Sequence, residues 1–282
     1  MLVALLAGGL LVAIHRPASG PPPAVAEARP TLAPGVQRYE VEALVLERGT
    51  EGARLCVKSV LLPLDAVPAC SGPSITNWEW DRVDGQRSGG GARWGTYAVT
   101  ATYRDRRVTL AETPTPVSKP RAAEDHDRFV PPCPEPKGGW ARVGRPGSNS
   151  PATAEARART QPDFAGSWRY DIPTDRRTDG GPSVVAIVAF TGNLDRHRRD
   201  LQAVWGGPLC VIARSHTRAE LRSVADTLPR APDGLDVDGV GVDDVTGAIQ
   251  LTVVAVPTGA ERRLVERYGV PFHLEGLMRP VS

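Results

Sequence analysis

The sequence predicts an α+β protein: a small antiparallel β-barrel or sandwich of OB-like size, then a ferredoxin-like α/β sandwich, with an apolar helix at the N-terminus. Two patterns indicate this class. In the first half of the folded chain, apolar and polar residues alternate with a period of two, which is typical of half-exposed strands. From Ser183 onward, apolar β-branched runs alternate with amphipathic segments, which is typical of helices packed on a sheet. A chain of 282 residues is long enough for two domains.

The N-terminal residues predict an exported protein. Leu2–Ile14 carries no charged side chain, and as a helix it would be roughly 20 Å long, shorter than the roughly 30 Å hydrocarbon core of a bilayer. We assign residues 1–16 to a signal peptide or to the end of a transmembrane anchor, with cleavage left open. Residues 17–36 are rich in proline and alanine and predict a linker. The expected location is extracytoplasmic, membrane-anchored or secreted.

Cysteine usage agrees with export. The four cysteines are Cys56, Cys70, Cys133 and Cys210, and none lies in a Cys-x-x-Cys pair or beside a histidine at metal-ligand spacing. In an oxidising compartment they would form disulfide bonds, with three possible connectivities. We favour Cys56–Cys70 and Cys133–Cys210, because the first two belong to one β-rich domain. No cofactor or metal is expected.

Residues 37–113 predict the β-rich domain. Tyr39–Leu46 alternates as a half-exposed strand does, and Arg54–Leu62 adds a second, mostly apolar strand. Thr96–Tyr103 and Arg107–Glu112 predict a hairpin. A small barrel or sandwich is the simplest arrangement of such strands.

Three tryptophans of this domain form a candidate ligand surface. Trp78 and Trp80 are two residues apart and would share one face of a strand, with Trp94 further along. Such a platform suits a sugar or a base. The alternative is that the aromatic rings close one end of the barrel. Since no basic residues are interleaved, we favour the structural alternative.

The same residues resemble a family of uncharacterised exported proteins of high-GC Gram-positive bacteria. In that family an LCLG-type strand is followed by a P-x-C-S/G-G-P loop, a W-x-W pair and a W-G-x-Y/F strand. Here LCVKSV, PACSGPSITNWEWDRVDG and RWGTYAVTATY follow the pattern. They include Cys56, Cys70, Trp78, Trp80 and Trp94.

A second element supports the resemblance. The run CPEPKGGW, Cys133–Trp140, matches a C-P-E-P-x-G-G-W element of those proteins, whereas Lys58 and Ser59 depart from the usual glycine of the first strand. The resemblance implies an envelope location and two disulfide bonds. It implies no activity, since none is established for the family.

Residues 114–182 predict a connector, and residues 183–282 the α+β sandwich domain. The connector has a short helix at Pro151–Thr160 and an aromatic segment at Phe164–Tyr170 that we expect to pack on a domain. The sandwich domain is expected to hold three helices and five strands, the last at a sheet edge. The helices are Asn193–Trp205, Thr217–Leu228 and Ala260–Tyr268, and the strands are Ser183–Phe190, Pro208–Arg214, Val237–Val242, Ala248–Val256 and Val270–Met278.

Local motifs refine the second domain. Thr217-x-x-Glu220 and Thr258-x-x-Glu261 predict capping boxes at two helix starts. The tail from Ser215 faintly resembles the pro-regions of secreted bacterial serine proteases, which carry an S-x-x-x-L helix, a G-V-x-x-D strand start and a hairpin. This resemblance implies a topology and little more.

Catalytic motifs are absent from the sequence. It has no G-x-S-x-G, Walker A or HExxH motif, and no G-x-G-x-x-G follows a strand. The five histidines are scattered, and we expect His197 to be a hydrogen-bonded structural residue. Leu235–Asp244 has several aspartates but lacks the third ligand and the final glutamate of an EF-hand loop. We therefore predict no catalytic residues, which leaves an enzyme of unrecognised type open.

The net charge of +2 is too small to indicate nucleic-acid binding or attraction to a membrane surface. The predicted function is binding of an envelope protein or a wall component outside the membrane. Contact with the membrane is expected only through the N-terminal segment. An alternative is an inhibitor or folding assistant of a secreted serine protease, from the resemblance of the tail.

Overall fold

A computed structural model describes residues 36–60, 67–118, 126–137, 139–140, 150–176 and 183–281. The chain divides into two compact units, Met1–Thr31 and Leu32–Ser282, and the described residues all belong to the second. The predicted signal or anchor segment and nearly all of the predicted linker lie outside the described residues. Within the described residues, no helix is long and apolar enough to cross a membrane.

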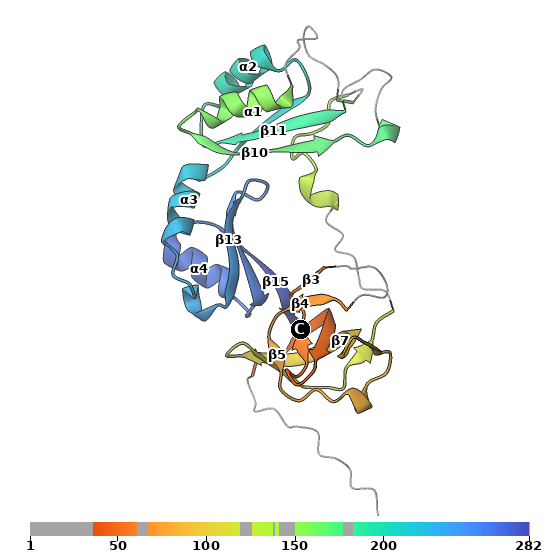
Figure 1. Cartoon of the computed structure of the whole chain (residues 1–282). Helices are drawn as coiled ribbons and strands as arrows, with labels where there is room; N and C mark the ends of the chain where they lie inside the picture. The colour runs from red at the N-terminus through yellow and green to blue at the C-terminus, as the bar shows by residue number, and fades with distance from the viewer. Residues whose placement is uncertain are drawn as a thin grey trace, which may run out of the picture. The chain divides into compact units, whose positions relative to one another are not determined.

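The described chain has a mixed α+β structure, as the sequence predicts (Figure 1). Its strands form a ten-stranded sheet, a three-stranded sheet and a two-stranded sheet.

The first strands pair in a closed ring. β1 (Tyr39–Arg48) pairs with both β2 (Arg54–Leu55) and β7 (Ala92–Arg104). β2 pairs with β5 (Ser74–Ile75), and β5 pairs with β8 (Arg107–Leu110). β8 pairs in turn with β7, which closes the ring. Every pairing in this ring is antiparallel except β5–β8, which is parallel. A closed ring protects these strands from edge-to-edge association.

Several shorter elements occur in the same part of the chain. They are β3 (Lys58–Val60), β4 (Ala69–Ser71), β6 (Arg87–Gly89), β9 (Thr115–Pro116) and the 3-10 helices η1 (Trp80–Arg82) and η2 (His126–Phe129). The predicted β7–β8 hairpin is present, with Asp105 and Arg106 at φ 50° and 59° in the turn. Positive φ at both central residues matches the right-handed twist of the two strands.

The rest of the chain shows one order of elements twice: helix, strand, strand, helix, strand. The first copy contains α1 (Pro151–Arg159), β10 (Phe164–Asp171), β11 (Val184–Phe190), α2 (Leu194–Val204) and β12 (Leu209–Ala213), with η3 (Thr174–Arg176) before β11. The second contains α3 (Arg218–Thr227), β13 (Val237–Asp243), β14 (Ala248–Ala255), α4 (Ala260–Tyr268) and β15 (Phe272–Pro280), with η4 (Pro232–Gly234) before β13. This repeat was not predicted from the sequence.

The two copies agree in detail. In each, the first two strands are antiparallel and the third is parallel to the second. Ala186 N donates to Pro208 O at 3.0 Å in the first copy, and Ile249 N donates to Pro271 O at 2.9 Å in the second. The residues that precede α2 and α4, Asn193 and Gly259, are both left-handed.

The helices and strands predicted after Ser183 are confirmed within one or two residues at each end, but their arrangement differs from the prediction. β11 and β12 form a sheet with β10, whereas β13, β14 and β15 belong to the ten-stranded sheet. The single ferredoxin-like sheet is therefore not formed. The physical reason is that β10, which we had expected only to pack on a domain, is the antiparallel neighbour of β11.

Two finer predictions are also wrong. β15 is not an edge strand, because Pro280 and Arg279 pair with Tyr39 and Glu40 of β1. The second capping box is absent: α4 has Gly259 as its N-cap without a side-chain hydrogen bond, and the Thr258 hydroxyl donates to Gln37 instead. The first capping box, Thr217 with Glu220, is confirmed in both directions.

Candidate functional site

The predicted disulfide bonds are both present. Cys56 pairs with Cys70 and Cys133 with Cys210, with Cα atoms 5.1 Å and 5.8 Å apart. The first pair lies beside Trp94 in a small apolar cluster, and Cys210 is 1% exposed in another. All four cysteines are thus oxidised, which leaves no thiol for nucleophilic chemistry.

The tryptophans do not form the open platform considered from the sequence. Trp80 and Trp94 are 4% and 8% exposed and belong to different apolar clusters. Trp78 precedes η1 and Trp80 begins it, so they do not share a face of a strand. Their rings are 5.2 Å apart and both pack on Tyr97, at 5.0 Å and 6.3 Å. This aromatic cluster belongs to the core inside the ring of strands.

The same cluster contains unpaired donors. The indole N–H groups of Trp78 and Trp80 and the hydroxyl of Tyr97 are buried without a hydrogen-bond partner among the described residues. Burial, and secondarily the Asp84 carboxylate, raise the pKa of Tyr97, so this hydroxyl remains a neutral donor. Buried donors of this kind commonly bind an ordered water.

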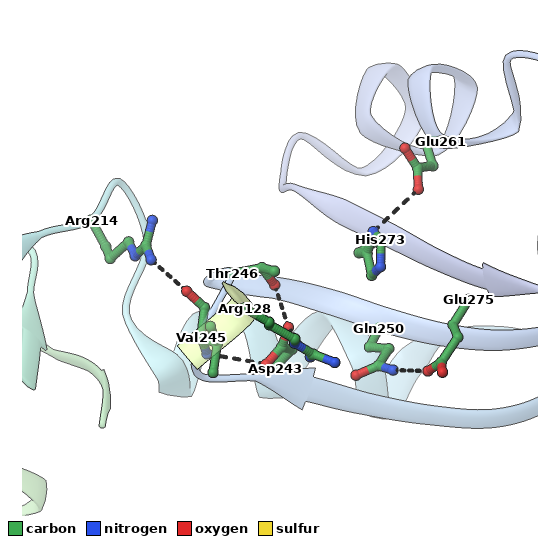
Figure 2. Close-up of polar contacts among 9 residues, drawn as sticks. All are labelled: Arg128, Arg214, Asp243, Val245, Thr246, Gln250, Glu261, His273 and Glu275. Atoms are coloured by element: carbon green, nitrogen blue, oxygen red, sulfur yellow. Dashed lines mark hydrogen bonds and ion pairs between the residues drawn. The ribbon is translucent and has the colours of Figure 1, made fainter. Parts of the chain in front are cut away.

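The main polar site is the turn between β13 and β14 (Figure 2). Asp243 is 8% exposed and accepts three hydrogen bonds: from Val245 N at 3.1 Å, from the Thr246 hydroxyl at 2.7 Å and from the Arg128 guanidinium at 2.7 Å. Burial alone would raise the pKa of Asp243. The hydrogen bonds from Thr246, Val245 and Arg128 outweigh it, so the pKa lies below its ordinary value.

The next residues of this turn contact the first copy of the repeat through Ser167 and Arg214, and they contact the start of α3 through Arg218. Asp244 accepts from Arg218 Nε at 2.7 Å and from Ser167 N at 3.1 Å, and Val245 O accepts from Arg214 at 2.6 Å. Gly166 permits this approach, because a Cβ there would lie 3.0 Å from the Asp244 carbonyl oxygen. The arginines and aspartates neutralise one another, which is the arrangement of a structural clamp.

A third polar group borders a cleft of about 260 Å³. Tyr103 and Arg106, at the β7–β8 turn, both donate to the Asp236 carboxylate, Arg106 at 2.8 Å. Burial and the bond to Asp236 raise the pKa of Tyr103 far above its ordinary value. Arg230 also lines the cleft. Asp236 and Asp243 therefore have different arginine partners and do not converge on one point.

Each described histidine side chain lies beside a carboxylate. His197 is 4% exposed, stacks on Phe190 with ring centroids 3.8 Å apart, and has Nε2 2.8 Å from Asp163. The prediction of a hydrogen-bonded structural histidine is confirmed. His273 lies 3.5 Å from Glu261 (Figure 2), and His216 lies 3.9 Å from Glu220.

Sequence reasoning missed the polar residues that matter most to the fold. Arg128 lies in the predicted connector, 115 positions before Asp243, and Tyr103 lies 133 positions before Asp236. Nothing local in the sequence links such pairs. Within the described residues, no group of three or more histidine, cysteine, aspartate or glutamate side chains could hold a metal ion.

Comparisons with known proteins add no relative. The chain matches no protein-family model and no curated protein.

Proposed function

We propose that this protein acts in the cell envelope, outside the cytoplasmic membrane, by binding another protein or a wall component. The two disulfide bonds support an oxidising compartment. Among the described residues, buried polar groups are paired inside the fold, as Asp243 is with Arg128 and His197 is with Asp163. The polar groups that a partner can reach therefore lie on the surface. This distribution favours recognition over catalysis.

We also propose that the ring of strands is an OB-like barrel. The order β1–β2–β5–β8–β7 with a parallel β5–β8 pair supports this assignment. Small barrels of this class bind ligands through the loops at one end and the adjoining strand face.

The cleft beside the β7–β8 turn is the observation that carries the binding proposal. The Arg106 side chain is 70% exposed although it pairs with Asp236, and Arg230 is exposed in the cleft lining. The lining also contains Asp105 and Asp236, and Asp236 pairs with Arg106, so Arg230 is the guanidinium group that favours a partner with a carboxylate or another acidic group.

Site-specific photo-crosslinking in the native host tests this proposal. A photoreactive residue replaces Arg230, and the matched control replaces Arg196, a 69% exposed arginine of α2 that does not line the cleft. We expect one dominant adduct from position 230 alone, and mass spectrometry distinguishes a protein from a wall fragment. The same adduct pattern at both positions, or none at position 230, would contradict binding at the cleft.

Charge reversal of the same residue provides a quantitative prediction. Arg230→Glu should weaken binding of the identified partner by up to about fivefold, since an exposed charge contact contributes up to about 1 kcal/mol. Arg196→Glu should leave affinity unchanged. Calorimetry with the purified partner measures both, and equal effects of the two variants would rule out a specific role for Arg230.

A second candidate function follows from the tail. The order of α3, the β13–β14 hairpin, α4 and β15 agrees with the topology that the resemblance to protease pro-regions implies. We infer an inhibitor or folding assistant of a secreted serine protease as the alternative. Unchanged hydrolysis of a peptide substrate by such proteases, in excess of this protein, would exclude the inhibitor.

A further inference from the structure

A single aromatic side chain of this protein is exposed. All its phenylalanines, tyrosines and tryptophans lie within the described residues, and each is buried or half-buried except Phe129, which is 42% exposed. Val130, the next residue, is 45% exposed. The two side chains lie at the end of η2. Apolar side chains that gather on a surface, unlike single ones, mark a site of interaction.

Prolines extend this apolar surface. Residues 131, 132, 134 and 136 are prolines, and the last three of them are exposed. Every residue from 130 to 136 is a proline or directly precedes one. Proline fixes its own φ and restricts the preceding residue to extended conformations. Residues 129–136, here called the proline segment, therefore lose little conformational entropy when they bind a partner.

The fold holds the backbone of the proline segment in place. The Phe129 carbonyl oxygen accepts a hydrogen bond from Trp168 Nε1 at 3.2 Å, and Cys133 is bonded to Cys210 of β12. Cys210 is 1% exposed, so the disulfide bond ties the segment to a buried strand. The backbone is thus fixed while the side chains of Phe129 and Val130 remain accessible, and a partner meets them already positioned.

We propose that the proline segment binds a different protein, one that presents a groove lined by tryptophan or tyrosine rings. Grooves of this kind recognise proline-rich segments, because flat aromatic rings pack against proline rings. The ring of Phe129 adds an aromatic contact that such a groove accommodates edge-on or offset. This surface shares no residue with the lining of the cleft, so it is a second interaction site beyond the proposed one.

Other partners fit the segment less well. Addition of a strand requires backbone donors, and four prolines in the segment supply none. A second copy of this chain lacks the groove, since none of its tryptophans and tyrosines is exposed. A wall glycan requires hydrogen-bonding side chains, whereas Phe129, Val130 and the exposed prolines are apolar.

Photo-crosslinking of the full chain in the native host tests the proposal. A photoreactive residue replaces Val130, and the matched control replaces Val265, a valine of α4 that is 40% exposed. We expect an adduct with another protein from position 130 alone, mapped by mass spectrometry to a peptide that contains tryptophan or tyrosine. An adduct with a second copy, with a wall fragment or with a peptide lacking these residues would overturn the proposal, as would no adduct. An adduct from position 230 alone would leave the cleft as the binding site.

Substitutions measure the role of the segment in binding. Phe129→Ala keeps the carbonyl oxygen that binds Trp168 and removes the exposed ring, so affinity for the captured protein should fall at least about tenfold by calorimetry. Pro134→Ala should weaken binding roughly two- to fivefold, because it relaxes an exposed part of the backbone. Val265→Ala should have no effect.

Near-UV circular dichroism verifies that each variant is folded. Native affinity in folded Phe129→Ala would overturn the proposal even where an adduct forms. If Phe129→Ala does not fold, Pro134→Ala decides, since this exposed residue makes neither the bond to Trp168 nor the disulfide bond.

Discussion

At the scale of single residues, the fold depends on charges that are buried with their partners. Asp243 accepts hydrogen bonds from a backbone N–H, a hydroxyl and the Arg128 guanidinium. Loss of one partner of such a group leaves the others buried and unpaired, which costs more than the net value of the bond.

Asp243→Asn should lower the free energy of unfolding by about 2 kcal/mol. This is less than for a fully buried ion pair, because the Arg128 side chain is 26% exposed and solvent screens it. The control is Asp195→Asn, since Asp195 also pairs with an arginine but is 84% exposed; we expect a change within about 0.5 kcal/mol. Urea unfolding measures both, and equal losses would refute the clamp at Asp243.

The same variant should change the response to acid. The pKa of Asp243 in the folded state lies below its ordinary value of 3.8, so the folded state favours the charged carboxylate. The resulting stability is fully present above pH 3.8 and is lost as the pH falls through the folded-state pKa. Unfolding curves between neutral pH and pH 2 should therefore descend less steeply for Asp243→Asn than for the native chain.

Residue types alone predicted only part of the candidate site. The cysteine pairs followed from their number and their place in the chain, and His197 from its isolation in the sequence. Trp78, Trp80 and Trp94 were considered as a ligand surface because aromatic rings often bind ligands. Such rings are equally suited to packing in a core. Arg106, Arg128 and Arg230 gave no local signal, because their roles depend on residues distant in sequence.

At the scale of elements, capping separates two helices that look alike in sequence. Thr217→Ala removes a side chain that accepts from Glu220 N at 3.1 Å at the start of α3, and should cost about 1 kcal/mol. Thr258→Ala alters the same motif before α4, where the hydroxyl does not cap the helix, and should cost less than about 0.5 kcal/mol. Thermal unfolding compares them, and a larger loss for Thr258→Ala would contradict this difference.

Local periodicity predicted the elements better than their arrangement. Ala260–Tyr268 was predicted with the observed bounds, because an amphipathic helix between left-handed glycines is encoded by adjacent residues. The division of the strands between two sheets was missed, because β10 and β11 are separated by a polar segment that resembled a connector. The repeat was missed for a related reason: the copies share geometry at turns and prolines more than they share side chains.

At the scale of the whole molecule, the ends of the described chain meet in one sheet. β15 pairs with β1, and Val254, Ala255 and Met278 belong to the same core as Val45 and Tyr97. The second copy of the repeat therefore shares its sheet and part of its core with the ring of strands. The first copy has its own sheet. Hydrogen bonds from Ser167 and Arg214 join this copy to the β13–β14 turn, and the disulfide at Cys210 joins it to the segment that contains Cys133.

The two disulfide bonds should consequently differ in their effect on stability. They close loops of very different length, with sequence separations of 14 for Cys56–Cys70 and 77 for Cys133–Cys210. Chain entropy predicts losses of about 3 kcal/mol and about 4.5 kcal/mol on their removal. We expect Cys133→Ser with Cys210→Ser to reduce the urea midpoint more than Cys56→Ser with Cys70→Ser. Hydrogen exchange shows whether the Cys133–Cys210 bond also holds the native structure of β10–β12 in place. If it does, the backbone amides of these strands lose protection when the bond is removed. Unchanged protection would mean that the Asp244 contacts are sufficient to hold this part of the fold.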